Sequence, residues 1–73
     1  MNKVQEGIHN LYLAEKMGET DRVDFYSWDG ICKLRDWAMK QDWWDSPIFF
    51  EYLRRNWCNL ANAIYELLND RKN

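Results

Sequence analysis

The last third of the chain carries apolar residues at spacings of three and four, which is the pattern of an amphipathic helix with a deep apolar face. This stripe comprises Phe50, Leu53, Trp57, Leu60, Ile64 and Leu67. Segment 45–47 reads Asp-Ser-Pro, a capping side chain followed by a proline that suits the first turn of a helix. We therefore predict one long helix from Pro47 to about Asn69, with the stripe buried and Trp57 at its centre.

The first segment has a shorter amphipathic pattern, with apolar residues at Val4, Ile8, Leu11 and Tyr12. We expect this helix to end at Met17, because Gly18 tolerates the left-handed conformation that closes many helices. Residues 23–27 predict an irregular link, and a fourth helical segment there is the alternative.

A second helix is predicted from Trp28 to about Gln41, with Ser27 as its N-cap. Its apolar residues cover more than half of the helical wheel, so we expect it in the middle, packed by its neighbours on two sides. The predicted fold class is all-α: a small three-helix bundle, or four-helix if residues 23–27 join, with a long C-terminal amphipathic helix and one domain over residues 1–73.

Composition limits the classes of partner. At 73 residues, burial of roughly 60% of the unfolded surface makes a lone core marginal, so partner binding or dimerisation would add stability. The net charge of −2 provides no overall attraction to nucleic acid or anionic lipid. The sequence lacks a long apolar run, and its first residues lack the apolar core of a secretion signal. We expect a cytoplasmic protein that makes no membrane contact.

Sequence motifs for catalysis or cofactor binding are missing, including glycine-rich phosphate loops and paired-cysteine zinc sites. His9 is the sole histidine, and its place on the first helix favours a surface or partly buried role. Cys32 and Cys58 are expected to be small packed thiols, because they are far apart and lack a CxxC spacing. We therefore expect no enzymatic activity, no cofactor and no metal.

Two carboxylates flank the Trp43-Trp44 pair. Asp42 and Asp45, with Glu51, could form an acid–base pair or hold a hard cation. A capping role is favoured, with Asp45 at the start of the last helix and Asp42 at the end of the second.

Arginines at Arg54 and Arg55 offer an alternative function, because a helix carrying both could contact nucleic acid. Glu51 precedes them at helical spacing, however, and such mixed charges favour ion pairs over a basic stripe. Nucleic acid is therefore the alternative partner.

Aromatic residues provide the strongest functional signal, since 11 of the 12 lie between Phe25 and Tyr65. We predict an exposed partner-binding patch made of Trp43, Trp44, Ile48 and Tyr52, with a charged rim of Asp42, Asp45, Glu51 and Arg55. Two alternatives stay open: one tryptophan of the pair and Tyr52 fold inward to cap the core, or the patch joins two copies into a homodimer.

In size and composition the chain resembles the small stoichiometric binders of mobile elements, such as phage-encoded inhibitors, anti-defence proteins and immunity-type proteins. This resemblance implies a non-enzymatic protein-binding module that acts by occluding a surface on another protein. The alternatives are a small nucleic-acid-associated regulator and a homo-oligomeric structural subunit.

Overall fold

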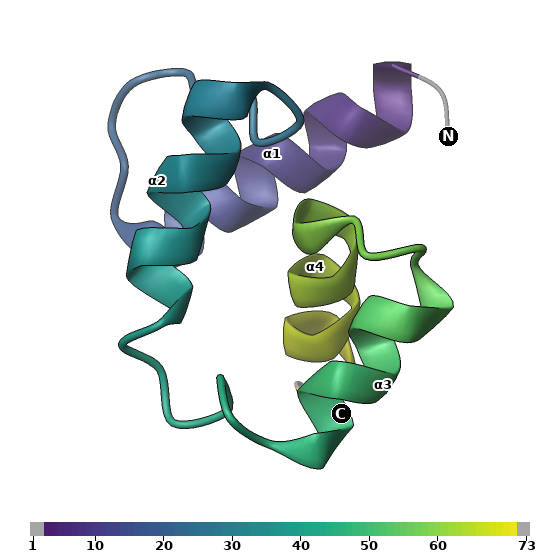
Figure 1. Ribbon diagram of the computed structural model, residues 1–73. Helices are drawn as coiled ribbons and strands as arrows, with labels where there is room; N and C mark the ends of the chain where they lie inside the picture. Colours follow the sequence, from purple (N-terminus) through teal and green to yellow (C-terminus); the bar gives the residue numbers. More distant parts are fainter. Residues whose placement is uncertain (1–2, 72–73) are drawn as a thin grey trace.

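The computed structural model describes residues 3–71, and within them the fold is an all-α bundle without strands. This confirms the predicted fold class. Figure 1 shows four helices: α1 (Lys3–Met17), α2 (Trp28–Ala38), α3 (Pro47–Arg55) and α4 (Leu60–Arg71).

Helix α1 ends where the sequence predicts. Gly18 follows Met17 with a φ of 75°, a left-handed conformation that costs glycine nothing. The Gly18 amide donates to the carbonyl of Glu15, and the Glu19 amide donates to the carbonyl of Ala14. These two bonds form a Schellman motif, with Gly18 in the left-handed position.

Residues 19–27 form the irregular link that the sequence favours over a fourth helix. Phe25 anchors this connector, with its side chain fully buried. The connector then passes so close to α2 that a Cβ added to Gly30 would lie 1.8 Å from the carbonyl oxygen of Asp24. Ser27 caps α2 as predicted, and its hydroxyl accepts from the Gly30 amide at 3.2 Å. Helix α2 ends at Ala38, one turn earlier than expected.

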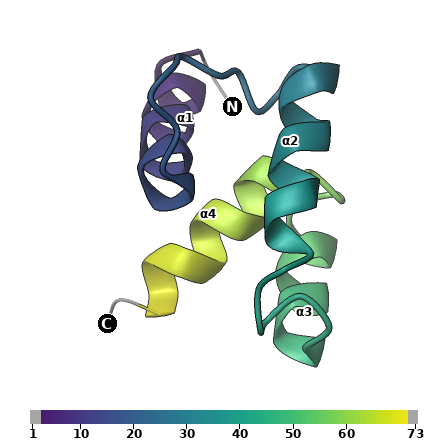
Figure 2. The ribbon, with the colours of Figure 1, turned by 90° about the vertical axis from the view of Figure 1, so that its left-hand side faces the viewer.

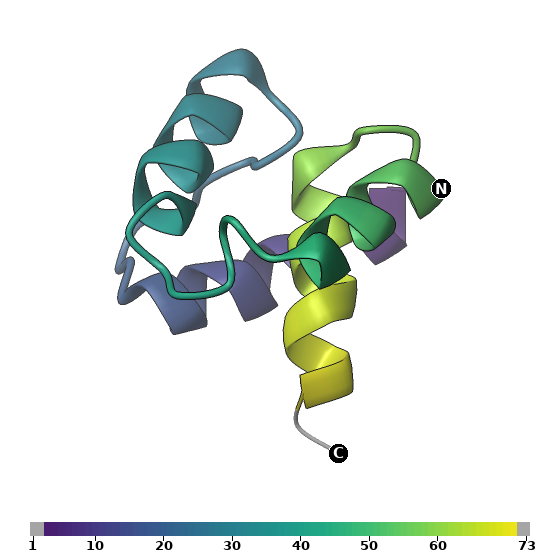
Figure 3. The same cartoon turned by 60° about the horizontal axis from the view of Figure 1, so that its bottom comes forward.

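The prediction of one long C-terminal helix is wrong, because two helices, α3 and α4, form there. Helix α3 begins at Pro47 as expected, with Ser46 as the N-cap instead of Asp45. It ends at Arg55, and Asn59 starts α4 by accepting a hydrogen bond from the Asn62 amide on its side-chain oxygen. Helices α3 and α4 then fold back against each other, as Figure 3 shows.

Helix α4 occupies the central position that we expected for α2. It packs against each of the other three helices, and Figure 2 shows α1 and α3 on opposite sides of it. Its apolar side chains explain this place in the fold, since its buried face has small residues in the first turn and large ones after them: Ala61, Ala63, Ile64 and Leu67. Small side chains let the neighbouring helices approach closely.

The buried stripe predicted along residues 50–67 is therefore correct for α4 and for Leu53 of α3, which packs against the core. Phe50 is 75% exposed and Trp57 is 94% exposed, although both were expected in the core. Breaking the helix after Arg55 changes the direction of the chain, so the spacing of three and four no longer keeps these side chains on one face. In the part of the chain that the structure describes, no helix combines the length and apolar character needed to cross a membrane.

Candidate protein-binding surface

The end of α3 presents the most exposed aromatic side chain of the described residues. Trp57 lies just beyond the end of the helix, and Phe50 is exposed on the outer face of α3. Phe50 and Arg54 are four residues apart, so they share the outer face of α3, and Trp57 follows three residues later. We call Phe50, Arg54 and Trp57 the α3 surface.

Trp57 occupies a backbone position that normally belongs to glycine. Its amide donates to the carbonyl of Arg54, and the Cys58 amide donates to the carbonyl of Leu53. This is the same Schellman motif that closes α1, with Trp57 in the place of Gly18. The φ of Trp57 is 56° and that of Cys58 is 61°.

A left-handed conformation is unfavourable for a bulky L-residue by about 1–2 kcal/mol. Within the described chain the Trp57 side chain offsets almost none of this cost, because 94% of it is in contact with solvent. Backbone strain combined with a large exposed aromatic ring points to a role outside the fold itself.

Arg54 adds a charged group to the α3 surface. Its guanidinium donates to the Glu51 carboxylate at 2.6 Å, and this hydrogen bond raises the pKa of Arg54 further above its ordinary value. Both side chains of this ion pair are exposed. Such a pair can exchange its internal bond for bonds to a partner.

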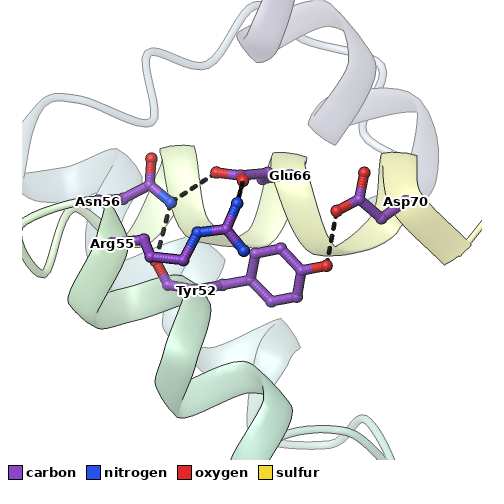
Figure 4. Close-up of polar contacts among 5 residues, drawn as sticks. All are labelled: Tyr52, Arg55, Asn56, Glu66 and Asp70. Atoms are coloured by element: carbon purple, nitrogen blue, oxygen red, sulfur yellow. Dashed lines mark hydrogen bonds and ion pairs between the residues drawn. The ribbon is translucent and has the colours of Figure 1, made fainter.

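Polar contacts between side chains fasten α3 to α4 (Figure 4). Tyr52 donates to Asp70 at 2.6 Å, and Arg55 pairs with Glu66 at 2.8 Å. The Asn56 side chain donates both to the other oxygen of Glu66 and to the carbonyl of Tyr52, each at 2.8 Å. The end of α3, directly before Trp57, is thus held against α4.

The predicted exposure of Trp43 is wrong. Trp43 is only 7% exposed, and its ring centre lies 6.0 Å from that of Trp37, in an edge-on arrangement, and 5.1 Å from that of Phe49, with the two rings tilted. Trp44 is half-buried, with its ring 5.2 Å from that of Phe49. The alternative in which one tryptophan of the pair caps the core describes Trp43, and a direct contact between Trp43 and a partner would require unfolding of this cluster.

The other predicted site residues lie on two parts of the surface. Asp42 and Ile48 line a shallow hollow with Trp43, and Arg71 closes it by pairing with Asp42 at 3.7 Å. Asp45 is exposed in the turn before α3. Tyr52 and Arg55 instead belong to the contacts between α3 and α4, with the Arg55 guanidinium 5.1 Å from the centre of the Tyr52 ring. Contact between these residues and a partner stays a prediction.

His9 joins α1 to the connector and to α4. Its Nδ1 lies 2.8 Å from the Tyr26 hydroxyl, which donates to the side-chain oxygen of Asn62. Its ring stacks on Tyr65 with 3.9 Å between the ring centres. These contacts give the half-buried histidine a structural role.

Tyr26 keeps its proton well above neutral pH, because burial, followed by the negative charges of Glu6 and Asp24, raises its pKa to about 12. Among residues 3–71, no group of three or more histidine, cysteine or acidic side chains is arranged to hold a metal ion.

The two cysteines are both free thiols. Cys32 is half-buried on α2, whereas Cys58 is exposed, so the expectation of a packed thiol is wrong for Cys58. Cys58 lies in the left-handed turn directly after Trp57, with a φ of 61°.

Comparison with protein-family models, with curated protein sequences and with solved structures finds no match to this chain.

Sequence reasoning missed the α3 surface because the spacing of Phe50 and Trp57 fits a buried stripe. One local signal was available: Asn59 stands where an N-cap would start a new helix, and Asn56 is a poor residue for a helix interior. Together they indicate a break between residues 56 and 59.

Proposed function

We propose that the protein is a small non-enzymatic binding module that occludes a surface of another protein, and that the α3 surface makes the central contact. The observation that carries this proposal is the exposed tryptophan on a left-handed backbone at the end of α3.

The residue types of the α3 surface and the ordered turn that carries them support protein binding. Tryptophan and arginine are enriched among the residues that dominate binding energy at protein interfaces, and Phe50 adds exposed apolar area beside them. The Schellman hydrogen bonds and the α3–α4 contacts hold the turn before binding, so little ordering cost remains to be met.

Nucleic-acid binding through Arg54 and Arg55 is less well supported. Each arginine is paired with a carboxylate, Glu51 or Glu66, so a phosphate would have to compete with an existing ion pair. No observation favours this function over protein binding.

The size and composition that resemble phage-encoded inhibitors, anti-defence proteins and immunity-type proteins fit the same mode of action. A rigid helical bundle with one prominent aromatic contact acts by covering its target, with no chemical step. Under this proposal the binding is stoichiometric, and inhibition follows from blocked access.

The test is affinity capture from host lysate with the parent chain and two tryptophan variants. Trp57→Gly removes the exposed ring and suits the left-handed backbone, so the fold should persist while captured protein is lost. Trp28→Ala is the matched control, because Trp28 is also exposed, at 78%, but lies on α2. We expect Trp28→Ala to capture the same protein as the parent.

Affinity for the captured partner, once purified, should fall by about 2 kcal/mol or more in Trp57→Gly, roughly a thirtyfold loss. Equal capture by all three proteins would refute a central role for the α3 surface. Capture of nucleic acid that disappears at high salt would favour the regulator alternative. Concentration-dependent mass in light scattering, abolished by Trp57→Gly, would instead favour self-association.

A further inference from the structure

A second surface lies on α1, on the opposite side of α4 from α3 (Figure 2). The outer face of α1 and the connector border an open groove of about 830 Å³. Val4, Ile8 and Leu11 line it at helical spacing, and each is more than half exposed. These three residues face away from the core, which Leu13 of the same helix enters with its side chain fully buried.

The walls of the groove are held in place within the protein. Asn10 on α1 accepts the Phe25 amide at 2.9 Å and donates to Asp24 at 3.3 Å, which ties the connector to the helix. Glu19, at the start of the connector, pairs with Lys33 of α2 at 3.2 Å. A preformed apolar groove can bind a ligand without a large ordering cost.

Gly7 stands among the apolar residues of the groove without a reason inside the described chain. A glycine within a helix is unfavourable relative to alanine, yet a Cβ added at Gly7 would meet nothing within 4 Å. The open space above it would let the backbone of another chain approach α1 closely. This is the second observation that points to an external ligand.

The rim of the groove is acidic. Four carboxylates and one guanidinium line it, which gives a formal charge of −3: Glu15, Glu19, Asp21, Asp24 and Arg22. Three of these carboxylates, Glu15, Asp21 and Asp24, are exposed and form no salt bridge among residues 3–71, although Asp24 already accepts a hydrogen bond from Asn10; with the exposed Arg22 they carry a net charge of −2. Their charges are therefore available to a cationic ligand.

We propose that this α1 groove binds a cationic amphipathic helix of another protein. Its apolar side chains would lie between Val4, Ile8 and Leu11, because ridges spaced by three and four residues are what a second helix fits. Lysine or arginine residues flanking its apolar face would pair with Glu15 and Asp21. A second copy of the chain would bring two acidic rims together, and an anionic lipid surface would repel the same rim.

The test is a titration of the full chain with a synthetic helical peptide of about 14 residues. The peptide carries leucines at spacings of three and four on one face, flanked by lysines. Two control peptides have the same leucines with glutamate in place of lysine, and the same composition in scrambled order. We expect calorimetric binding of the lysine peptide alone, with amide shifts in NMR spectra confined to α1 and the connector.

Three variants sharpen the assignment. Ile8→Ser should weaken the lysine peptide by roughly tenfold or more, and Glu15→Lys combined with Asp21→Lys should weaken it by a similar factor at low salt and less at high salt. Gly7→Ala should raise the melting temperature while it lowers affinity. Met39→Ser is the matched control, an exposed apolar residue that caps the C-terminus of α2, and should leave affinity unchanged.

Several results would overturn this proposal: no binding at roughly 1 mM peptide, equal binding of the glutamate peptide, or shifts outside the groove. Association with lipid vesicles without peptide binding would indicate a membrane surface instead. Groove shifts that follow protein concentration would indicate a second copy. None of these results depends on the partner of the α3 surface, so the two proposals stand or fall separately.

Discussion

The two turns that flank α3 use tryptophan in opposite ways. Segment 39–46, before the helix, places the Trp43 side chain in an aromatic cluster with Trp37 and Phe49. Successive turn hydrogen bonds hold the backbone of this segment. Segment 56–59, after the helix, places Trp57 in solvent on a strained backbone. The first tryptophan contributes to the core and the second contributes almost nothing to it.

Gly18 provides the reference for this comparison, because α1 and α3 end in the same pair of backbone hydrogen bonds. The glycine meets the left-handed requirement without strain, whereas Trp57 meets it at a cost. The difference shows that the motif needs no side chain at this position. The indole of Trp57 must therefore be explained by something beyond the hydrogen-bonding of the turn.

The largest expected effect is on the buried turn. Trp43→Ala should lower the free energy of unfolding by about 3–5 kcal/mol, because it leaves a large cavity between Trp37 and Phe49. Urea denaturation followed by circular dichroism measures this loss. Trp57→Ala is the control and should change stability by less than about 0.5 kcal/mol. Similar losses in the two variants would break the comparison.

The next-largest effect is expected when a bulky residue is placed in the left-handed position at the end of α1. Gly18→Trp should lower the free energy of unfolding by about 1 kcal/mol, because it imposes the left-handed penalty on α1. A steric contribution is not expected, since a Cβ at Gly18 would meet nothing within 4 Å. Denaturant midpoints of the variant and the parent measure the change. An unchanged midpoint would mean that this motif tolerates a bulky residue without strain.

The reverse substitution should stabilise the protein. Trp57→Gly relieves about 1–2 kcal/mol of backbone strain but makes the unfolded chain more flexible by about 0.4–1 kcal/mol, so we expect a net gain of about 0.5–1 kcal/mol. The exposed indole leaves no cavity behind. Thermal melts of parent and variant test the sign, and a lower melting temperature would show that Trp57 stabilises the fold in a way that its exposure conceals.

The end of α1 and the starts of α2 and α3 could be predicted from the sequence. Ser27 accepts a backbone amide as predicted, Ser46 does so in place of the expected Asp45, and Gly18 closes α1, because these interactions depend on residues close in the chain. The starts of α2 and α3 and the all-α class follow from such signals together with the apolar spacing, whereas the start of α4 was not predicted.

The end of α3 could not be predicted from the sequence in the same way. The spacing of three and four continues through residues 56–59, and a tryptophan in a left-handed C-cap is too unusual for the pattern to indicate. Once the helix is broken there, the positions of Phe50 and Trp43 depend on how α3 folds back on α4, which the local sequence pattern does not indicate. For this reason the candidate binding site is the α3 surface and not the patch predicted around Trp43 and Trp44.

The smallest effect concerns the contacts that hold the exposed turn. The hydrogen bond to Asp70 is the main reason that the pKa of Tyr52 is raised, while Arg55 acts in the opposite direction. A group with a raised pKa in the folded state stabilises fully below its unfolded pKa, which for tyrosine is about 10, and loses this contribution as the pH rises through the folded value. Tyr52 should therefore contribute at neutral pH and lose that contribution in alkaline solution.

Tyr52→Phe isolates this contribution, because it removes the hydroxyl and leaves the ring beside Arg55. We expect a slightly lower melting temperature than the parent at about pH 7, and a difference that shrinks toward about pH 11. Tyr26, with a pKa raised to about 12, titrates in the same alkaline range in both proteins and so does not affect the difference. A difference that stays constant with pH would mean that the Tyr52–Asp70 bond does not help to hold the exposed turn, and that the backbone bonds of the Schellman motif suffice.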